Sequence, residues 1–205
     1  MWKVLCNFRL LRLINAQAPA VLFKYYFRSG VGADRNIIKR NNRCRSTITK
    51  GDKMAFWWAN QGQSHEWKNG YLWASEKDKK GVINQTHENV LSVQPGNIIF
   101  SYDGGEIIAV GVSLTRGFKT KTPEERVENG VPPEINGYRA NIIYRVFENE
   151  KKIKFQDIKE QVSRYEQEDK REHSLLDKNL NPKEGYLYSI SPALGWYLLF
   201  KINEK

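Results

Sequence analysis

Short apolar and aromatic runs, separated by turn residues, are the main pattern of the chain after Met54. Runs of this length that are rich in aromatic and β-branched residues are typical of β-strands. The third and fourth runs are joined by Asp103-Gly104-Gly105, a turn sequence that predicts a β-hairpin. The pattern predicts strands at residues 56–60, 71–74, 97–102, 106–114, 138–147 and 185–190.

Two later segments have a helical pattern instead. In residues 155–168, the apolar side chains from Ile158 onward recur at the spacing of one helix face. The other segment follows Ser191 and Pro192, residues that favour a helix cap and a first helical turn. Strands and helices do not alternate regularly. The predicted fold class is therefore α+β, with a small curved β-barrel or sheet of about six strands and flanking helices.

Charge divides the chain at Met54. Residues 1–53 hold 12 Lys and Arg against two acidic residues, and therefore the whole net charge of +10, whereas residues 54–205 are neutral. Residues 1–53 have three interpretations: a disordered basic arm that binds nucleic acid, an organellar transit peptide, or an upstream region translated from a start codon assigned too early. We favour the third, because residues 50–54 (KGDKM) can be encoded by a bacterial ribosome-binding sequence followed by ATG. The predicted functional domain is residues 54–205.

Composition and motifs exclude several classes of protein. A hydrophobic content of 40% with 27% charged residues excludes a disordered chain. The apolar runs are shorter than the roughly 18 to 20 residues that span a bilayer, so we expect a cytoplasmic protein with no membrane partner.

Motifs for catalysis and metal binding are missing from the sequence. Both cysteines precede Met54 and the three histidines lack a metal-binding spacing, so we expect no metal and no cofactor. Asp103 and Glu106 are explained by the hairpin turn, and Asp157 has no partner acid on a preceding strand. We therefore do not expect an enzyme.

The aromatic residues are the chemically distinctive group. Trp57 and Trp58 are neighbours on a strand, so their side chains point to opposite faces, and Trp73 and Tyr102 lie on later strands. Amide side chains accompany them in residues 60–63. Aromatic walls that stack on a flat ring, with amides that bind its edge, make a pocket for a planar ligand. Packing in the core is the alternative for each aromatic side chain.

Several segments also carry a family resemblance, and they occur in this order: 56–63 (FWWANQGQ), 70–74 (GYLWA), 93–102 (VQPGNIIFSY), 105–111 (GEIIAVG) and 185–191 (GYLYSIS). Together they resemble EVE-type domains of the PUA-like superfamily, which are relatives of YTH domains. The version most like this chain is found at the N-terminus of HNH-type, modification-dependent restriction endonucleases. The resemblance begins at Phe56 and leaves residues 1–53 outside it.

The resemblance implies a module that flips a modified base, such as 5-methylcytosine, out of DNA into an aromatic cage. Its place would be the recognition part of a restriction or defence system. The alternative is a binding domain for a small planar ligand such as a nucleotide or free base. The chain ends at Lys205 without an HNH domain, so we do not expect cleavage, and a separate nuclease subunit is a candidate partner.

The residues expected to form the site fall into three groups. The cage is expected to use Trp58 and Trp73, then Trp57 and Tyr102. Contacts to the base edge or the backbone are expected from Asn60, Gln61, Gln63 and Ser75. Candidate phosphate contacts come from basic clusters, for which a solvated loop is the alternative: Lys77, Lys79, Lys80, Arg116, Lys119, Lys121 and Arg126.

Overall fold

The computed structural model describes most of the chain after residue 53. The expectations for residues 1–53 and for Gln63, Lys79 and Lys80 lie outside the described residues. The structure describes residues 54–62, 64–77, 81–169 and 173–204.

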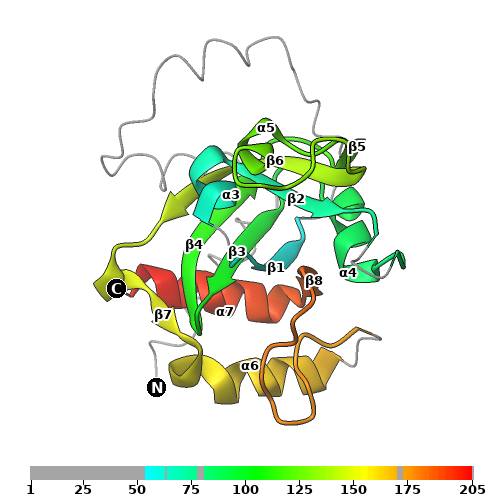
Figure 1. Cartoon of the computed structure of the whole chain (residues 1–205). Helices are drawn as coiled ribbons and strands as arrows, with labels where there is room; N and C mark the ends of the chain where they lie inside the picture. Colours follow the sequence, from blue (N-terminus) through cyan, green and yellow to red (C-terminus); the bar gives the residue numbers. More distant parts are fainter. Residues whose placement is uncertain (1–53, 63, 78–80, 170–172, 205) are drawn as a thin grey trace, which may run out of the picture. The chain divides into compact units, whose positions relative to one another are not determined.

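The described residues form an α+β domain built on a curled, half-barrel mixed sheet (Figure 1). The main strand order is β2-β6-β4-β3-β1-β8, with β5 paired to β6 and β7 paired to β4. β1 and β3 are parallel, and the other described strand pairs are antiparallel. The strands are β1 (Phe56–Asn60), β2 (Tyr71–Ser75), β3 (Ile98–Asp103), β4 (Glu106–Ser113), β5 (Phe118–Thr120), β6 (Gly137–Val146), β7 (Ile153–Lys154) and β8 (Leu187–Ile190).

Short helices connect the strands, and two longer helices follow the sheet. The bounds are α3 (Ser64–Asn69), α4 (Gln85–Glu88), η1 (Asn89–Ser92), α5 (Glu124–Val127), η2 (Asn149–Lys151), α6 (Phe155–Asp169) and α7 (Pro192–Asn203). Among the described residues, none of these helices combines the length and the apolar character needed to cross a bilayer.

The strand and helix predictions are confirmed for the long elements. Each of the six expected strands is present, and α6 and α7 occupy the two expected helical segments. The sequence pattern predicts no strand or helix in residues 116–136, but this segment contains β5 and α5. The sequence does not predict β5, because three residues are too few to show an alternating pattern of apolar and polar side chains. The strand forms by pairing with β6.

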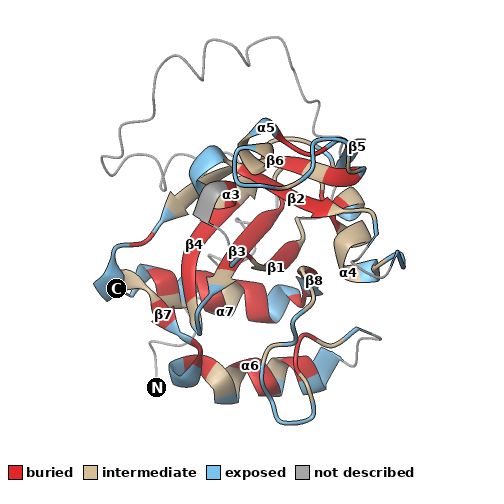
Figure 2. Ribbon diagram, viewed as in Figure 1, coloured by how far each residue is buried: buried red, intermediate tan, exposed pale blue. Residues whose placement is uncertain are grey.

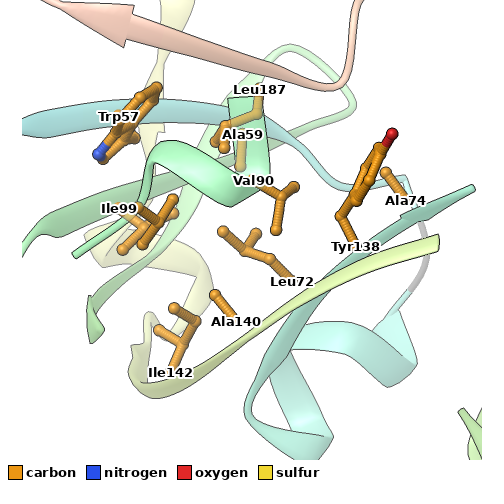
Figure 3. Packing of buried hydrophobic residues seen from close by; sticks show 11 residues of the cluster. Trp57, Ala59, Leu72, Ala74, Val90, Ile99, Tyr138, Ala140, Ile142 and Leu187 are labelled. Carbon is orange, nitrogen blue, oxygen red and sulfur yellow. The ribbon is translucent and has the colours of Figure 1, made fainter. Parts of the chain in front are cut away.

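Alternation along β1 divides the core between two sides of the sheet. Trp57 points into a cluster with Leu72 and Ile99 on the inner face of the curled sheet (Figure 3). The next side chain, Trp58, points to the opposite face, where it meets Phe155 at the start of α6. Both faces of β1 are therefore covered, and the buried residues continue across the neighbouring strands (Figure 2).

The turn between β3 and β4 is the expected hairpin. Asp103 pairs with Glu106, and the two residues between them have positive φ angles, 56° at Gly104 and 88° at Gly105. Two consecutive positive φ angles belong to the turn type whose twist matches the paired strands, and glycine adopts them without strain.

The N-terminus of α7 is capped as expected. The hydroxyl of Ser191 accepts a hydrogen bond from the backbone N–H of Leu194 at 3.0 Å. Further along, Gly195 lies against Phe56 of β1, where an added Cβ would come within 2.1 Å of the ring. The missing side chain therefore allows the helix to pack closely on β1.

Candidate functional site

A pocket of about 200 Å³ lies where β1 and β2 end and β8 begins. A larger and more open hollow of about 530 Å³ lies along α6, and it contains none of the predicted site residues. The smaller pocket is lined by Asn60, Gln61, Gly62, Glu66, Trp73, Ala74, Ser75, His87, Arg126 and Tyr186.

The polar side of this pocket is organised around Glu66 of α3. Its side chain is 3% exposed, and its Oε1 lies 2.9 Å from Nη1 of Arg126. Its Oε2 accepts hydrogen bonds from Nε2 of Gln61 at 2.9 Å and from the hydroxyl of Tyr186 at 2.8 Å. This carboxyl group therefore connects α3 to α5, to the end of β1 and to the segment before β8.

Burial controls the ionisation of this group. Desolvation raises the pKa of Glu66 from 4.5 to about 7, although Arg126, Gln61 and Tyr186 each favour the charged form. Desolvation, followed by the nearby Glu66 carboxyl, also raises the pKa of Tyr186 well above its usual value. Tyr186 is therefore a neutral hydroxyl that donates to Glu66 and accepts from the backbone N–H of Trp73 at 2.9 Å.

Arg126 and Trp73 form a stacked pair at the pocket wall. The guanidinium carbon of Arg126 lies 4.8 Å from the centre of the Trp73 ring, and Nη1 donates to the backbone oxygen of Trp73 at 3.2 Å. Trp73 is 3% exposed and the side chain of Arg126 is 14% exposed. Arg126, a candidate phosphate contact from the sequence, is therefore a pocket residue that covers one face of the indole.

The two described amides expected to read a base edge both line the pocket, but they already have partners. Nδ2 of Asn60 donates to the backbone oxygen of Lys183 at 2.7 Å, and its Oδ1 accepts from Nε1 of Trp58 at 3.0 Å. Oε1 of Gln61 accepts from the hydroxyl of Ser101 at 2.5 Å. These hydrogen bonds hold the pocket in shape.

His87 and Ser75 lie on another side of the pocket. Nδ1 of His87 is 2.9 Å from the backbone oxygen of Ser75, and its ring meets the Tyr186 ring edge-on at 6.0 Å. The hydroxyl of Ser75 donates to the backbone oxygen of Lys77 at 2.8 Å. The expected contact residue Ser75 is therefore placed at the pocket, next to a histidine that the sequence did not single out.

Three of the four expected cage residues lie elsewhere. Trp57 is in the inner core, where its Nε1 donates to Oδ1 of Asn97 at 2.9 Å. Trp58 is fully buried and packs 4.8 Å from the ring of Tyr102 on the other face of β1. Since both faces of β1 are covered, neither tryptophan contacts the pocket, and Tyr102 stays with Trp58. Trp73 is the expected cage residue that lines the pocket.

The other described phosphate candidates lie outside the pocket. Lys119 and Lys121 form exposed ion pairs with glutamates, at 3.2 and 3.0 Å. Arg116 donates to the side chain of Gln94 at 2.9 Å. Lys77 is exposed just beyond the end of β2. Contact of these residues with phosphate remains a prediction.

Sequence reasoning missed three important pocket residues: Glu66, His87 and Tyr186. Glu66 and His87 lie on helices of six and four residues, which are too short to show a helical period. Tyr186 lies within the segment 185–191 that carries the family resemblance, and this was the one available signal. Within the described part of the chain, no group of three or more His, Cys, Asp or Glu is placed to hold a metal ion.

No model of a known protein family matches the chain, and no curated protein matches it. Among solved structures, the crystal structure of protein Atu2648 from Agrobacterium tumefaciens is similar at 12% sequence identity, covering 73% of this chain and 92% of that one, with a TM-score of 0.36. This similarity is too weak to assign a fold family or a function.

Proposed function

We propose that this protein is a non-enzymatic binding module of the EVE-type, PUA-like kind, which takes up a single modified base flipped out of DNA. One observation carries the proposal. Three segments that bear the family resemblance, 56–63, 70–74 and 185–191, are far apart in the sequence and converge on one pocket. The curled α+β sheet is compatible with a PUA-like fold.

The size and walls of the pocket suit one flat ring. Its volume of about 200 Å³ is below the roughly 300 to 1,000 Å³ of sites for larger ligands. Bases in nucleic-acid complexes stack on aromatic rings and on guanidinium planes, and each stacked base contributes about 1 to 3 kcal/mol. The Arg126–Trp73 pair, with Tyr186 and His87, supplies such surfaces. Stacking would offset much of the few kcal/mol that base flipping costs.

The restriction enzymes that the chain resembles combine a recognition domain with a nuclease. We propose that this protein recognises the modified base and that a separate nuclease subunit would cleave. Modified cytosine is the proposed target, because the domains that the chain resembles read such bases.

Replacing Trp73 tests this function. We expect Trp73→Ala to weaken binding of a modified oligonucleotide by at least about tenfold, because the stacked Arg126–Trp73 wall is lost. Fluorescence anisotropy against oligonucleotides carrying different modified cytosines measures the affinity, and circular dichroism checks that the variant is folded.

A second variant covers the case in which Trp73→Ala does not fold. Ser75→Leu places a branched side chain at the pocket and should also weaken binding, whereas Ser92→Leu, on an exposed position outside the pocket, should not. Unchanged affinity in both pocket variants would reject the pocket as the binding site.

Charge favours a second candidate, a site for a free base or nucleotide. Residues 54–205 carry no net charge, and Lys119 and Lys121 are paired with glutamates, so attraction of a phosphate backbone is weak. Binding of DNA should weaken as salt is raised, in proportion to the number of phosphates contacted, while binding of a free nucleoside should change little. Titrations at two salt concentrations with both kinds of ligand distinguish the two functions.

A further inference from the structure

Two neighbouring apolar side chains are exposed in the connection between β2 and α4 (Figure 1). Val82 is 59% exposed and Ile83 is 58% exposed. Six large apolar side chains are exposed in the part of the chain that the structure describes, and these two are the ones that are consecutive in the sequence. Exposed apolar side chains are ordinary when they are scattered singly. The position of this pair beside the pocket is what gives it significance.

Both ends of the connection are attached to the pocket. Ser75, the last residue of β2, lines the pocket, and its hydroxyl donates to the backbone oxygen of Lys77. Lys77 forms an antiparallel β-bridge with Ile83. Two residues later α4 begins, and this helix carries the pocket residue His87. The spacing along the chain and across the bridge places the Cα atom of Ile83 within about 13 Å of the Cα atom of Ser75.

The backbone around the pair is ordered at its base and open on its outer side. Gly81 has a φ angle of 79°, and a Cβ added there would meet no atom within 4 Å. On the other side of the pair, Oδ1 of Asn84 accepts from the backbone N–H and the hydroxyl of Thr86, at 2.9 and 2.8 Å. This cap and the bridge to Lys77 fix the segment before a ligand binds, which lowers the entropy lost on binding.

The charges next to the pair favour a nucleic acid as its partner. Residues 77–83 contain three lysines and one aspartate, whereas residues 54–205 as a whole are neutral. Lys77 is exposed. DNA offers phosphates that attract lysines, and the faces of its stacked bases offer apolar surface to an inserted side chain. An apolar pair that follows several lysines therefore suits DNA better than it suits an apolar protein surface.

Base flipping would create a place that the pair can fill. A flipped base leaves the stack, and the loss of its stacking and pairing costs a few kcal/mol. Proteins that kink DNA insert apolar side chains, isoleucine among them, between base steps. The separation of Ile83 from Ser75 is comparable with the major-groove width of about 12 Å. One part of the protein can therefore hold the base while the other reaches the stack.

We propose that Val82 and Ile83 form a wedge that enters the base stack of duplex DNA at the place left by the flipped base. This inference rests on the proposed function and adds to it the surface that engages a duplex. The wedge would cover base faces that are otherwise exposed to water, and so stabilise the opened duplex. A single strand has no paired stack to hold open, so the wedge contributes little to its binding.

The experiment presents one modified base in a duplex and in a single strand. The same sequence carries 5-methylcytosine or 5-hydroxymethylcytosine at one position, and fluorescence anisotropy measures binding of the full chain. We expect the double variant Val82→Ser/Ile83→Ser to bind the duplex about tenfold more weakly than the wild type, because burial of two aliphatic side chains is lost. Its affinity for the single strand should stay within about twofold of the wild type.

A matched control and a direct probe of the stack accompany this comparison. Phe200 of α7 is 62% exposed and does not line the pocket, so Phe200→Ser should leave duplex affinity unchanged. A 2-aminopurine placed next to the modified base fluoresces more strongly when it loses its stacking partner. At saturating protein we expect a stronger signal with the wild type than with the double variant, in which the neighbouring bases can restack. Circular dichroism verifies that the variants fold.

The outcomes separate the wedge from the proposed function. Equal weakening of duplex and single-strand binding, no weakening of either, or binding of the single strand alone overturns the wedge. Loss of self-association in the double variant, measured by size-exclusion chromatography with unchanged duplex affinity, assigns the pair to a protein interface and also overturns it. In each of these cases the proposed function stands if the wild type prefers modified over unmodified oligonucleotides. Without that preference in either form, the proposed function fails, and the wedge fails with it.

Discussion

Two opposing effects act on the pKa of Glu66: burial raises it, and the residue's hydrogen-bond and ion-pair partners lower it. Its carboxyl group is almost fully removed from water, and it receives hydrogen bonds from Gln61 and Tyr186 and an ion pair from Arg126. Desolvation outweighs these three partners and raises the pKa to about 7. The pocket therefore contains a carboxyl group that changes charge close to neutral pH.

This raised pKa predicts a specific dependence of stability on pH. Between pH 4.5 and about 7, the folded state binds the Glu66 proton more tightly than the unfolded state. The stability that this group contributes is therefore complete below pH 4.5, and it is lost as pH rises to about 7. The size of the loss is roughly 3 kcal/mol. We expect the free energy of unfolding of the wild type, relative to Glu66→Gln, to fall across this range.

Urea unfolding at a series of pH values measures this difference. Subtracting the variant from the wild type removes the contribution of other titrating groups. Glu128→Gln changes an exposed carboxyl and controls for the altered net charge. A wild-type advantage that grows with pH would mean that Arg126, Gln61 and Tyr186 hold Glu66 ionised, contrary to the prediction.

At the scale of elements, the pocket depends on very short helices. α4 has four residues and carries His87, and its first turn is held by Asn84, whose Oδ1 accepts from the backbone N–H of Thr86 at 2.9 Å. The hydroxyl of Thr86 in turn accepts from the backbone N–H of Tyr186 at 2.9 Å. The Asn84 cap therefore positions both rings on this side of the pocket, the imidazole of His87 and the phenol ring of Tyr186.

Loss of the cap should weaken α4. Asn84→Ala removes the side-chain acceptor at the N-terminus of the helix and is expected to lower the free energy of unfolding by about 1 kcal/mol. Because His87 lies on this helix, ligand affinity should fall as well. Gln85→Ala, at the neighbouring exposed position, is the matched control. Equal unfolding curves for Asn84→Ala and the wild type would show that the cap does not stabilise α4.

The elements differ in how far sequence alone predicts them. β1, β4 and β6 are long enough for their aromatic and β-branched pattern to be visible, and Ser191 marks the start of α7 by its capping chemistry. α3 and α4 have no such pattern, because a helix of one or two turns owes its stability to tertiary packing. The polar half of the site lies on these short helices.

At the scale of the whole molecule, the sequence changes character at Met54: the net charge of +10 lies before it, and the segments that carry the family resemblance begin at Phe56. The core cluster runs from Trp57 to Leu187, and the pocket runs from Asn60 to Tyr186. We therefore expect a chain that starts at Met54 to have the same thermal unfolding midpoint and the same ligand affinity as the full chain. Differential scanning calorimetry and anisotropy test this, and the intact mass of the native protein identifies the start that is used. A lower midpoint in the shorter chain would contradict the expectation.

The sequence by itself determined the fold class, α+β, and the positions of the long strands and helices. Alternating apolar residues and turn signals predicted the long strands of the sheet. The zero net charge of residues 54–205 gave no general electrostatic reason to expect binding of nucleic acid. Only the tertiary structure decided which aromatic side chains can meet a ligand. Alternation placed Trp57 and Trp58 on opposite faces, but other elements cover both faces, so both are core residues. The curl of the sheet and two short helices bring Glu66, His87 and Tyr186 together, and no local pattern encodes contacts between residues so far apart in the chain.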